Sequence, residues 1–342
     1  MNDQYSLTIA IPTFNRAEYL ELNLRRLAEE MATTDPGAVE VLVSDNCSTD
    51  HTQSVVERAI ASGLPVRYVR NSENIGSDAN IAQCFNLAKG HYVQLLGDDD
   101  VYYDGTLSPV LAVLRGEEFG AICLRPYGYD FDYRSEYPGG GGEEQTFLDV
   151  GDFLSKIGPL VTFISSCVIN RRVLQNVDAR QFCGTNLVQV HLLLRAALLV
   201  RRNLFIGRYI MACKRNNSGG YDFSEVFVER LGKIFDSYVG TGLTQRDIDR
   251  FEHSMLLWYF PQYLLRMRLA GFKEIQATHR RFDARFSRKW MYHVWVAPIL
   301  NLPRPLALLW GGATALIGRL LIGDGRRGLH FILVRLRAWK RR

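Results

Sequence analysis

Three consecutive aspartates, Asp98, Asp99 and Asp100, stand directly after Gly97 and follow the apolar run Tyr92–Leu96. The apolar run predicts a buried strand, which would carry the three carboxylates into the loop at its end. Adjacent carboxylates repel one another unless a cation binds them, and oxygen ligands of this kind are typical of Mg²⁺ or Mn²⁺ sites. The triplet therefore indicates a divalent metal site, with a solvated acidic turn as the plain alternative.

Polar motifs follow three earlier apolar runs in the same way. Each motif leads into a segment with helical periodicity, so the chain alternates strand and helix and predicts a parallel sheet. Polar groups at successive carboxyl ends of parallel strands lie in one crevice, where open α/β sheets bind ligands. The apolar runs are Leu7–Ile11, Val39–Val43 and Val66–Val69. The four motifs, in chain order, are IPTFNR (11–16), VSDNCSTD (43–50), NSENIGSDAN (71–80) and LLGDDD (95–100).

These motifs, in this order and at this spacing, resemble the nucleotide-sugar half of family 2 glycosyltransferases, which have the GT-A fold. The resemblance covers residues 5–125 and extends more weakly to about residue 215. It implies an α/β fold with a Rossmann-like, mostly parallel central sheet flanked by helices. Within the family, the chain is most similar to transferases of O-antigen and other surface polysaccharides, including abequosyl- and rhamnosyl-transferase-like proteins.

The resemblance implies nucleotide-sugar contacts for individual residues of the first three loops. The matching positions are, loop by loop, Pro12, Thr13, Asn15 and Arg16; Asp45, Ser48 and Asp50; and Asn74, Gly76 and Asn80. Asp45 would meet the edge of the base, since carboxylates and amides can bond a pyrimidine, while a loop entering a helix offers N–H groups to phosphate. Two alternatives stay open: Asp50 as the N-cap of the following helix, and Gly76 as a turn glycine.

The acidic motif departs from the family's usual Asp-X-Asp-Asp, because Gly97 stands at the first position. By the resemblance, Asp99 matches the metal-binding aspartate and Asp100 the acid after it. Asp98 falls at the variable position and could offset the missing carboxylate. We therefore expect Asp99 to bind Mn²⁺ or Mg²⁺ with the help of Asp98 and Asp100. The metal would neutralise charge on the departing nucleoside diphosphate.

A catalytic base is harder to assign. Inverting members of the family commonly place a Glu-Asp pair before a Leu-X-Leu-Arg helix, and here that pair aligns with Val188 and Gln189, neither of which can take a proton. His191 lies in the same segment, and the ordinary pKa of histidine suits proton abstraction near neutral pH, so His191 is the candidate base. The alternative is a histidine packed in an apolar helix. Asp130 and Asp132 are the next candidates, and the stereochemical outcome stays open.

Length and composition suit a globular protein of more than one part. The 342 residues, 47% of them hydrophobic, are enough for one large α/β domain and an appendage. We expect a catalytic domain over residues 1–215, divided into a nucleotide-sugar half (1–125) and an acceptor half (126–215), followed by a helical region over 216–342. Within the acceptor half, the Tyr- and acid-rich segment Tyr127–Glu144 predicts a long loop, either an acceptor lid or a flexible link.

Two further features concern the diphosphate and the compartment. Lys214 and Arg215 are basic residues at the predicted domain edge, where they could close over the diphosphate of the donor; exposed surface charge is the plain alternative. The six cysteines show no paired short spacing, which is typical of reduced thiols in the cytoplasm and not of a disulfide or zinc framework.

Charge is distributed unevenly along the chain. From Arg266 to Arg342 there are 17 Lys and Arg residues and three acidic residues, a balance of +14, whereas the whole chain carries +5, so residues 1–265 carry −9. A basic tail indicates an anionic partner, and no nucleic-acid-reading motif accompanies it. The charge-free runs Trp290–Pro303 and Pro305–Gly318 have 14 residues each, fewer than the roughly 20 that span a bilayer. Tryptophans beside the basic residues predict that residues 285–342 lie on an anionic membrane surface; an ordinary helical subdomain is the alternative.

Together these features predict a metal-dependent glycosyltransferase, peripheral on the cytoplasmic face of the cell membrane. It would move a sugar from a nucleoside diphosphate sugar to a hydroxyl of a saccharide on a polyprenyl diphosphate, with no nucleic-acid partner. Two other functions stay open. A nucleotidyltransferase would use a similar nucleotide site, although no Gly-rich, Lys-containing phosphate loop follows the first strand. A catalytically idle membrane scaffold would explain the missing Glu-Asp pair.

Overall fold

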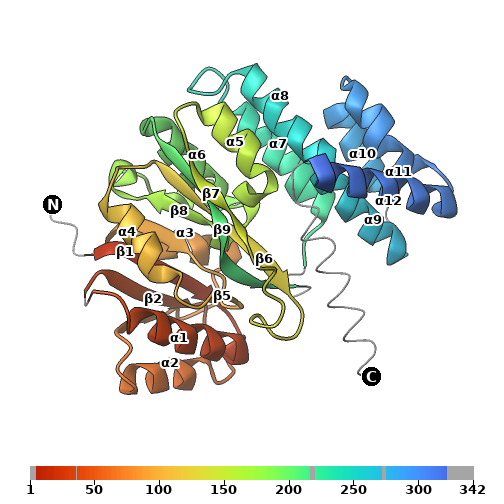
Figure 1. Cartoon of the computed structure of the whole chain (residues 1–342). Helices are drawn as coiled ribbons and strands as arrows, with labels where there is room; N and C mark the ends of the chain where they lie inside the picture. Colours follow the sequence, from red (N-terminus) through yellow and green to blue (C-terminus); the bar gives the residue numbers. More distant parts are fainter. Residues whose placement is uncertain (1–4, 36, 216–219, 272–274, 322–342) are drawn as a thin grey trace. The chain divides into compact units, whose positions relative to one another are not determined.

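The computed structural model describes residues 5–35, 37–215, 220–271 and 275–321. The chain forms two compact units (Figure 1). The first unit comprises Met1–Phe153 and Leu160–Gly219, and the second comprises Leu154–Pro159 and Gly220–Arg342. All nine strands of the sheet belong to the first unit, and the second unit is helical. All six cysteines are free thiols, as their spacing predicted.

The first unit is built on a nine-stranded mixed sheet with the strand order β3-β2-β1-β4-β8-β6-β9-β5, and β7 pairs with β9. The strands are β1 (Tyr5–Thr13), β2 (Val39–Asp45), β3 (Val66–Arg70), β4 (Gly90–Leu95), β5 (Asp100–Tyr102), β6 (Ala121–Tyr129), β7 (Gly141–Phe147), β8 (Cys167–Asn170) and β9 (Asn203–Lys214). Strands β1 to β4 are mutually parallel, which confirms the four strands expected from the apolar runs. β1, β2 and β4 are buried as expected, whereas β3 is partly exposed because it stands at the end of the strand order. Their registers bring the four polar motifs to one edge of the sheet.

Helices cover both faces of this sheet. They are α1 (Ala17–Met31), α2 (Thr52–Ala61), α3 (Ser77–Leu87), α4 (Leu107–Arg115) and α6 (Val188–Leu199), while α5 (Val150–Ile157) runs from the first unit into the second. Leu20 and Leu24, one turn apart on α1, pack in a buried cluster with Ile9 of β1 and with apolar residues of α2 and α4. On the opposite face, Asn80 of α3 bonds to Ser44 of β2. The parallel half is therefore a sheet between two helical layers, and its carboxyl edge stays open for a site.

The segment Tyr127–Glu144, predicted as one long loop, is partly strand. β6 continues to Tyr129, and β7 begins at Gly141 inside the glycine-rich run. β7 pairs antiparallel with β9, where a Cβ atom on Gly141 would lie 2.7 Å from the Cα atom of Arg208. The glycines thus permit two strands to approach closely. From the sequence alone, the same glycines predicted a loop.

The second unit is a helical body with an aromatic core. Its elements are the π-helical turn η5 (Glu225–Arg230), α7 (Leu231–Asp236), α8 (Gln245–Ser254), the π-helical turn η6 (Met255–Tyr259), α9 (Phe260–Leu269), α10 (Ile275–Phe286), the π-helical turn η7 (Tyr292–Val296), α11 (Ala297–Asn301) and α12 (Arg304–Leu321). Phe235 stacks on Phe251 with ring centroids 4.2 Å apart, and Phe260 meets Phe282 edge-on at 4.9 Å. None of the helices in the described ranges has the length and hydropathy needed to cross a bilayer.

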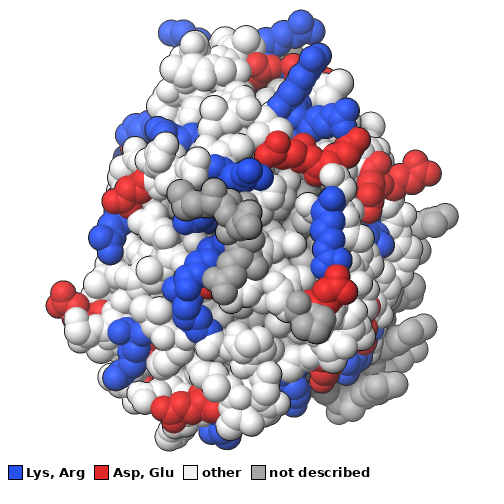
Figure 2. Space-filling model, turned by 90° about the vertical axis from the view of Figure 1, so that its left-hand side faces the viewer, with Lys and Arg blue, Asp and Glu red and all other residues white. Residues whose placement is uncertain are grey.

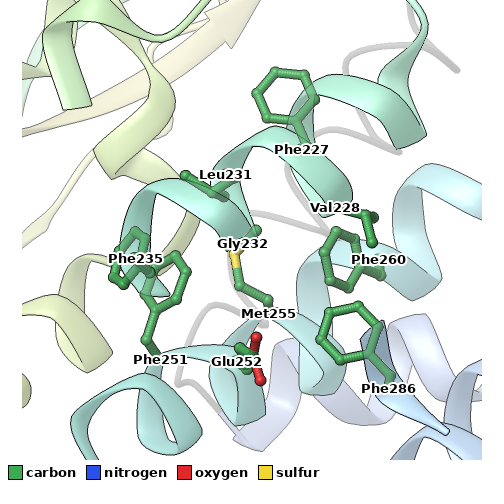
Figure 3. Close-up of a pocket in the computed structure, with 10 residues that line it drawn as sticks. All are labelled: Phe227, Val228, Leu231, Gly232, Phe235, Phe251, Glu252, Met255, Phe260 and Phe286. Atoms are coloured by element: carbon green, nitrogen blue, oxygen red, sulfur yellow. The ribbon is translucent and has the colours of Figure 1, made fainter. Parts of the chain in front are cut away.

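A small pocket lies inside this aromatic core (Figure 3). It is lined by Phe227, Val228, Leu231, Gly232, Phe235, Phe251, Glu252, Met255, Phe260 and Phe286. The one acidic side chain of the lining, Glu252, is paired with Arg285 at 2.6 Å and with Lys289 at 2.7 Å. With its charge neutralised in this way, the lining is apolar, and we describe the pocket as a gap in the core of the helical unit.

Candidate active site

Arg16, in the loop after β1, contacts two of the aspartates that follow β4. Its Nε atom lies 3.0 Å from Asp98 Oδ1, and its Nη2 atom donates to Asp99 Oδ2 at 2.7 Å. Thr13, the last residue of β1, donates from Oγ1 to Asp98 Oδ2 at 2.7 Å. Because β1 and β4 are parallel neighbours, both loops leave the sheet at the same edge. The first and fourth motifs of the sequence therefore form one polar cluster.

The three carboxylates point to different partners. Asp98 is buried and uses its oxygens for the contacts above, while the buried Asp100 accepts from Ser165 Oγ at 2.5 Å and from the Lys214 backbone N–H at 3.2 Å. Asp99 is partly exposed, with 17% of its side chain accessible. In the described part of the chain, no three His, Cys, Asp or Glu side chains converge into a ready metal cage. Asp99 is thus the most accessible of the three carboxylates, and a metal held there would take further ligands from the donor and water. The help expected from Asp98 and Asp100 stays a prediction.

Burial disfavours the charged form of two aspartates at this edge. It raises the pKa of Asp98 to about 6, against the opposing effect of the Arg16 guanidinium. Burial, followed by the neighbouring charge of Asp99, also raises the pKa of Asp100 well above its usual range. The pKa of Tyr129, at the end of β6, is raised first by burial and then by Asp100 and Asp99. The arrangement favours cations or hydrogen-bond donors as its partners.

The first and second loops are joined by hydrogen bonds. The backbone N–H of Asn15 donates to Ser48 Oγ at 2.9 Å, and the N–H of Thr49 donates to Asn15 Oδ1 at 2.7 Å. Asn15 has a φ of 53°, in the left-handed region that asparagine tolerates better than most residues. The asparagine in IPTFNR therefore shapes both loops, while its neighbours Pro12 and Phe14 remain partly exposed beside it.

Asp50 accepts hydrogen bonds from the first residue of two helices. Its Oδ2 atom accepts from the Ala17 N–H of α1 at 2.9 Å, and its Oδ1 atom accepts from the Thr52 N–H of α2 at 3.0 Å. The N-cap position of α2 is His51 and not Asp50, but the Asp50 carboxylate still accepts the first N–H group of α2 and also that of α1. Its proposed contact with the nucleotide stays a prediction.

Asp45, at the end of β2, has no exposed surface. Its Oδ1 atom accepts from the Ser48 N–H at 2.9 Å, and its Oδ2 atom accepts from the Tyr68 hydroxyl at 2.5 Å. Arg70 Nε lies 3.6 Å away. In this structure, Asp45 positions the second loop, and its contact with the base edge stays a prediction.

The third loop is held by amide side chains. Asn74 Oδ1 accepts from Asn46 Nδ2 at 2.7 Å and from the Gly76 N–H at 2.9 Å. Asn80 is buried and exchanges hydrogen bonds with Ser44, at 2.7 Å to the hydroxyl and 2.9 Å to the backbone oxygen. Gly76 has a φ of 85°, so glycine is required where the chain enters α3. Asn74 and Gly76 are exposed, and their contacts with the nucleotide stay predictions, whereas Asn80 supports the loop from inside.

Lys214 and Arg215 contact the turn that follows β6. Lys214 Nζ donates to the backbone oxygen of Asp130 at 2.5 Å. Arg215 Nη1 lies 3.0 Å from Asp130 Oδ2 and 3.3 Å from Glu136 Oε2. Glu136 also accepts the backbone N–H groups of Asp130 and Asp132. The two basic residues hold this turn here, and the ion pair to Arg215 makes Asp130 a poor candidate for the base.

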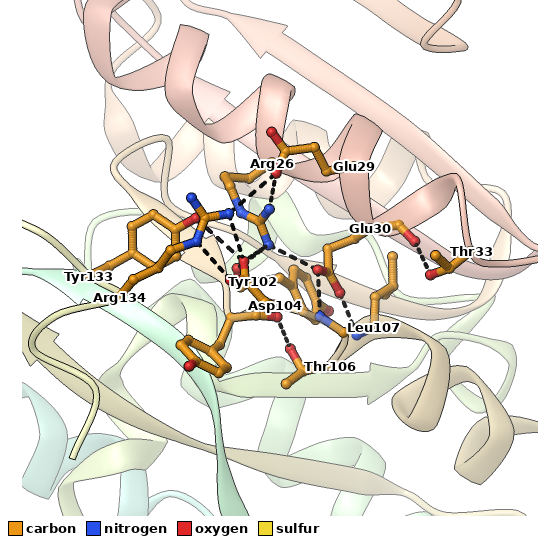
Figure 4. A network of polar contacts seen from close by, with 12 residues as sticks. Arg26, Glu29, Glu30, Thr33, Tyr102, Asp104, Thr106, Leu107, Tyr133 and Arg134 are labelled. Carbon is orange, nitrogen blue, oxygen red and sulfur yellow. Dashed lines mark hydrogen bonds and ion pairs between the residues drawn. The ribbon is translucent and has the colours of Figure 1, made fainter. Parts of the chain in front are cut away.

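A second polar network fixes the segment after the acidic motif (Figure 4). Arg26 of α1 is buried, and its Nη2 atom lies 2.9 Å from Glu30 Oε1 and 2.7 Å from Asp104 Oδ1. Glu30 Oε2 accepts from the Leu107 N–H at the start of α4, at 3.0 Å. Arg134 donates to Asp104 at 2.7 Å. Helix α1, the segment beyond Asp100 and the turn after β6 are thereby tied together.

His191, the candidate base, stacks on Phe182 with ring centroids 4.5 Å apart and ring planes 8° from parallel. Burial, with a further contribution from Arg195, lowers the pKa of His191 to about 4. An imidazole with this pKa is neutral at pH 7 but is a weaker base than an ordinary histidine. These surroundings favour the packing role over the catalytic one.

Gln189 is the residue that the resemblance aligns with the family's usual acid, and Ser165 is a site residue that the sequence did not reveal. Gln189 is 6% exposed; its Nε2 atom donates to the Thr162 backbone oxygen at 2.8 Å, and within the described ranges its Oε1 atom has no hydrogen-bond partner. Ser165 accepts from the Gly97 N–H at 2.9 Å and donates to Asp100, 65 residues away in the chain. No local pattern marks a serine whose partners are this distant.

Comparison with known proteins agrees with this geometry. The family model described as glycosyl transferase family 2 matches residues 8–177. The abequosyltransferase RfbV of Salmonella typhimurium is 33% identical over 121 residues, 35% of each chain. The GalNAc(5)-diNAcBac-PP-undecaprenol beta-1,3-glucosyltransferase of Campylobacter jejuni is 28% identical over 152 residues, 43% of this chain and 47% of the relative. The chain thus matches less than half the length of these curated relatives.

Solved structures share the fold. Residues 1–349 of S. aureus TarS, in complex with UDP-GlcNAc, superpose with a TM-score of 0.62 at 16% identity, covering 91% of this chain and 90% of that one. The mannosyltransferase PcManGT from Pyrobaculum calidifontis, in complex with GDP-Man and Mn²⁺, gives 0.52 at 17% identity, over 92% and 88%. With its GT-A fold, its four strand-end motifs on one edge and the match over residues 8–177, the chain belongs to glycosyltransferase family 2.

Proposed function

We propose that the chain is a glycosyltransferase that takes a sugar from a nucleoside diphosphate sugar and uses the loops at the carboxyl edge of β1 to β4. The observation that carries this proposal is the contact of Arg16 with Asp98 and Asp99, which joins the first and last motifs in one partly exposed cluster. Around it, Asn15, Asn74 and Gly76 are exposed. They offer polar groups on the same edge, as a nucleotide requires.

A divalent metal fits this cluster through Asp99. When bound, Mn²⁺ or Mg²⁺ would supply positive charge to the diphosphate leaving group. Arg16 already neutralises part of the charge on Asp99 and is long enough to serve a phosphate as well. Thr13 and Ser165 hold Asp98 and Asp100 in place, so that Asp99 keeps its orientation toward the open edge.

For the acceptor, we propose a hydroxyl of a lipid-linked saccharide in surface-polysaccharide synthesis. The support is the similarity to the Salmonella abequosyltransferase and to the Campylobacter enzyme, whose name specifies a saccharide on PP-undecaprenol. The turn between β6 and β7, held by Arg215 and Glu136, borders the acidic cluster and is a rigid edge against which an acceptor could lie.

A catalytically idle chain is the second candidate, because one specific observation favours it. Gln189, which cannot take a proton, stands where the family commonly places its base, and His191 is a weak base in its stacked position. An idle chain would bind the donor without transferring its sugar, because no group of this region would take the acceptor proton.

The test is a thermal-shift screen of the full chain with nucleoside diphosphates and their sugars, with and without Mn²⁺, followed by product analysis for each stabilising donor. We expect release of a nucleoside diphosphate, which Asp99→Asn abolishes while the exposed Asp35→Asn control does not. Release of pyrophosphate would assign a nucleotidyltransferase instead. Donor binding without hydrolysis or transfer to any acceptor would assign the idle scaffold.

A further inference from the structure

Helix α12 (Arg304–Leu321) of the second unit exposes its large apolar side chains. Leu309 is 72% exposed and Leu316 is 60% exposed. Together with others at spacings of three and four residues, they form one continuous stripe along the helix. The exposed stripe consists of Leu306, Leu309, Trp310, Ala313, Leu316, Ile317, Leu320 and Leu321.

The opposite face of α12 consists of small residues and packs on the rest of the unit. The buried residues of α12 are Ala307, Gly311, Thr314, Ala315 and Gly318. A Cβ atom added to Gly318 would lie 2.4 Å from the backbone oxygen of Leu257 in η6, and one added to Gly311 would lie 3.3 Å from Leu265 in α9. The contact between the helices is therefore so close that only small side chains fit.

This distribution is the reverse of that of a surface helix in a water-soluble protein, which buries its large apolar residues and exposes polar ones. Contiguous apolar surface of this kind marks an interaction site. The stripe is therefore a docking face, and the alternative of an ordinary helical subdomain leaves it unexplained.

Charge and tryptophans near the stripe indicate which partner it binds. On the face shown in Figure 2, Lys and Arg are interspersed with Asp and Glu. In contrast, residues 284–323 include no acid and contain five cations. Arg285 and Lys289 form ion pairs with acidic residues of α7 and α8, and the other three cations are Arg288 and, on α12 itself, Arg304 and Arg319. Trp290 is 72% exposed and Trp310 lies on the stripe itself. Exposed tryptophans beside cations and an apolar helix face are typical of helices in the headgroup region of a membrane.

We propose that α12 docks in the plane of an anionic phospholipid surface, with its apolar stripe inserted at the headgroup boundary. A second copy of the chain is a poorer partner, because a symmetric contact would bring two acid-free, basic segments together. Anionic lipid, in contrast, complements their charge. This proposal concerns the second unit and does not depend on the reaction proposed above.

Deleting the chain beyond Asp283 would remove α12 but would be a poor test. The deletion would also remove Phe286 and Tyr292, which pack in the aromatic core with Phe282. Charge substitutions on the stripe avoid this problem. The test chain carries Leu309→Glu, Leu316→Glu and Leu320→Glu. The control carries Ile60→Glu, Leu148→Glu and Leu199→Glu, three exposed apolar positions of the first unit, so that the two chains have equal net charge.

The measurement is sedimentation with vesicles of phosphatidylglycerol and phosphatidylcholine. We expect the unmodified chain and the control to sediment with the vesicles. The test chain should bind at least about tenfold more weakly, since each substitution removes an apolar side chain that would insert into the lipid. Salt of about 1 M should weaken binding only in part, because it screens charge but not apolar insertion. Unchanged melting temperatures would show that all chains are folded.

Two outcomes would overturn the proposal. One is equal vesicle binding by the test chain and the unmodified chain. The other outcome combines two results: no chain sediments with vesicles, and light scattering without lipid shows concentration-dependent self-association that only the test chain loses. The stripe would then be an interface between copies of the chain. Both outcomes are independent of whether a sugar donor is found.

Discussion

The side-chain amide of Gln189 donates a hydrogen bond from Nε2 to the backbone oxygen of Thr162, at 2.8 Å. This bond holds the start of α6 against the segment that contains Ser165, and Ser165 in turn holds Gly97 and Asp100. Gln189, which the resemblance aligns with the family's usual acid, thus supports the acidic cluster from a distance. A carboxylate at position 189 could not donate this bond. Glutamine at this position cannot act as a base, but it can hold the Thr162 segment.

Gln189→Glu should lower the free energy of unfolding by about 1–3 kcal/mol, since it removes the buried donor of this hydrogen bond and places a carboxylate beside a backbone oxygen. Denaturant unfolding at pH 8 measures this. The matched control is Gln181→Glu, whose exposed amide makes the same kind of bond to the Asp178 oxygen at 2.8 Å and should cost little. A rise in turnover with unchanged stability would instead mean that a carboxylate at this position can act as the base.

Arg16→Gln should increase the affinity for Mn²⁺ in the absence of nucleotide by roughly tenfold, because it removes the cation that competes for Asp99. Electron paramagnetic resonance of free Mn²⁺ provides the measurement. Arg58→Gln, which breaks an exposed pair with Glu21, is the control. Identical Mn²⁺ affinity in the Arg16 variant would argue against Asp99 as the metal ligand.

His191→Phe keeps the stack on Phe182. If His191 only packs there, turnover should stay within about tenfold of the unmodified chain, whereas loss of a general base would lower turnover by about 10²–10⁴-fold. The variant should also change the pH dependence of stability. The pKa of His191 is lowered from 6.5 to about 4 in the folded chain, so below pH 6.5 the unfolded chain binds the proton first and stability falls until about pH 4.

Thermal unfolding of both chains between pH 7 and pH 4 tests the second part. The His191→Phe chain should lose less stability over this range, because it lacks the titrating group. Parallel pH profiles for the two chains would contradict the lowered pKa, and a loss of turnover above a hundredfold with normal donor binding would restore His191 as the base.

Asp50→Ala should destabilise the fold by about 1–4 kcal/mol, up to twice the usual loss for one helix cap, because the carboxylate serves both α1 and α2. Chemical denaturation measures this, with Glu73→Ala in the neighbouring exposed loop as the control. A loss below about 0.5 kcal/mol, together with much weaker donor binding, would show that Asp50 acts mainly on the ligand.

The parallel half of the fold and the order of its loops could be read from the chain alone. Apolar runs such as Leu7–Ile11 and Val39–Val43 are long enough to specify buried strands, and parallel topology then brings the polar motifs that follow them to one edge. These are local patterns, and each one specifies its own element. For the same reason, the convergence of the motif ending in Arg16 with the motif ending in Asp100 was predictable.

The role of each side chain within that edge depended on contacts between distant segments. Asp98, Asp99 and Asp100 are chemically equal in the sequence, but Thr13 and Ser165 engage two of them and leave Asp99 partly exposed. The outward direction of the large residues of α12 was equally hidden, because apolar periodicity shows that a helix has a face but not what that face meets. Burial, hydrogen-bond partners and pKa shifts arise only when remote segments pack together, and so they belong to the tertiary structure.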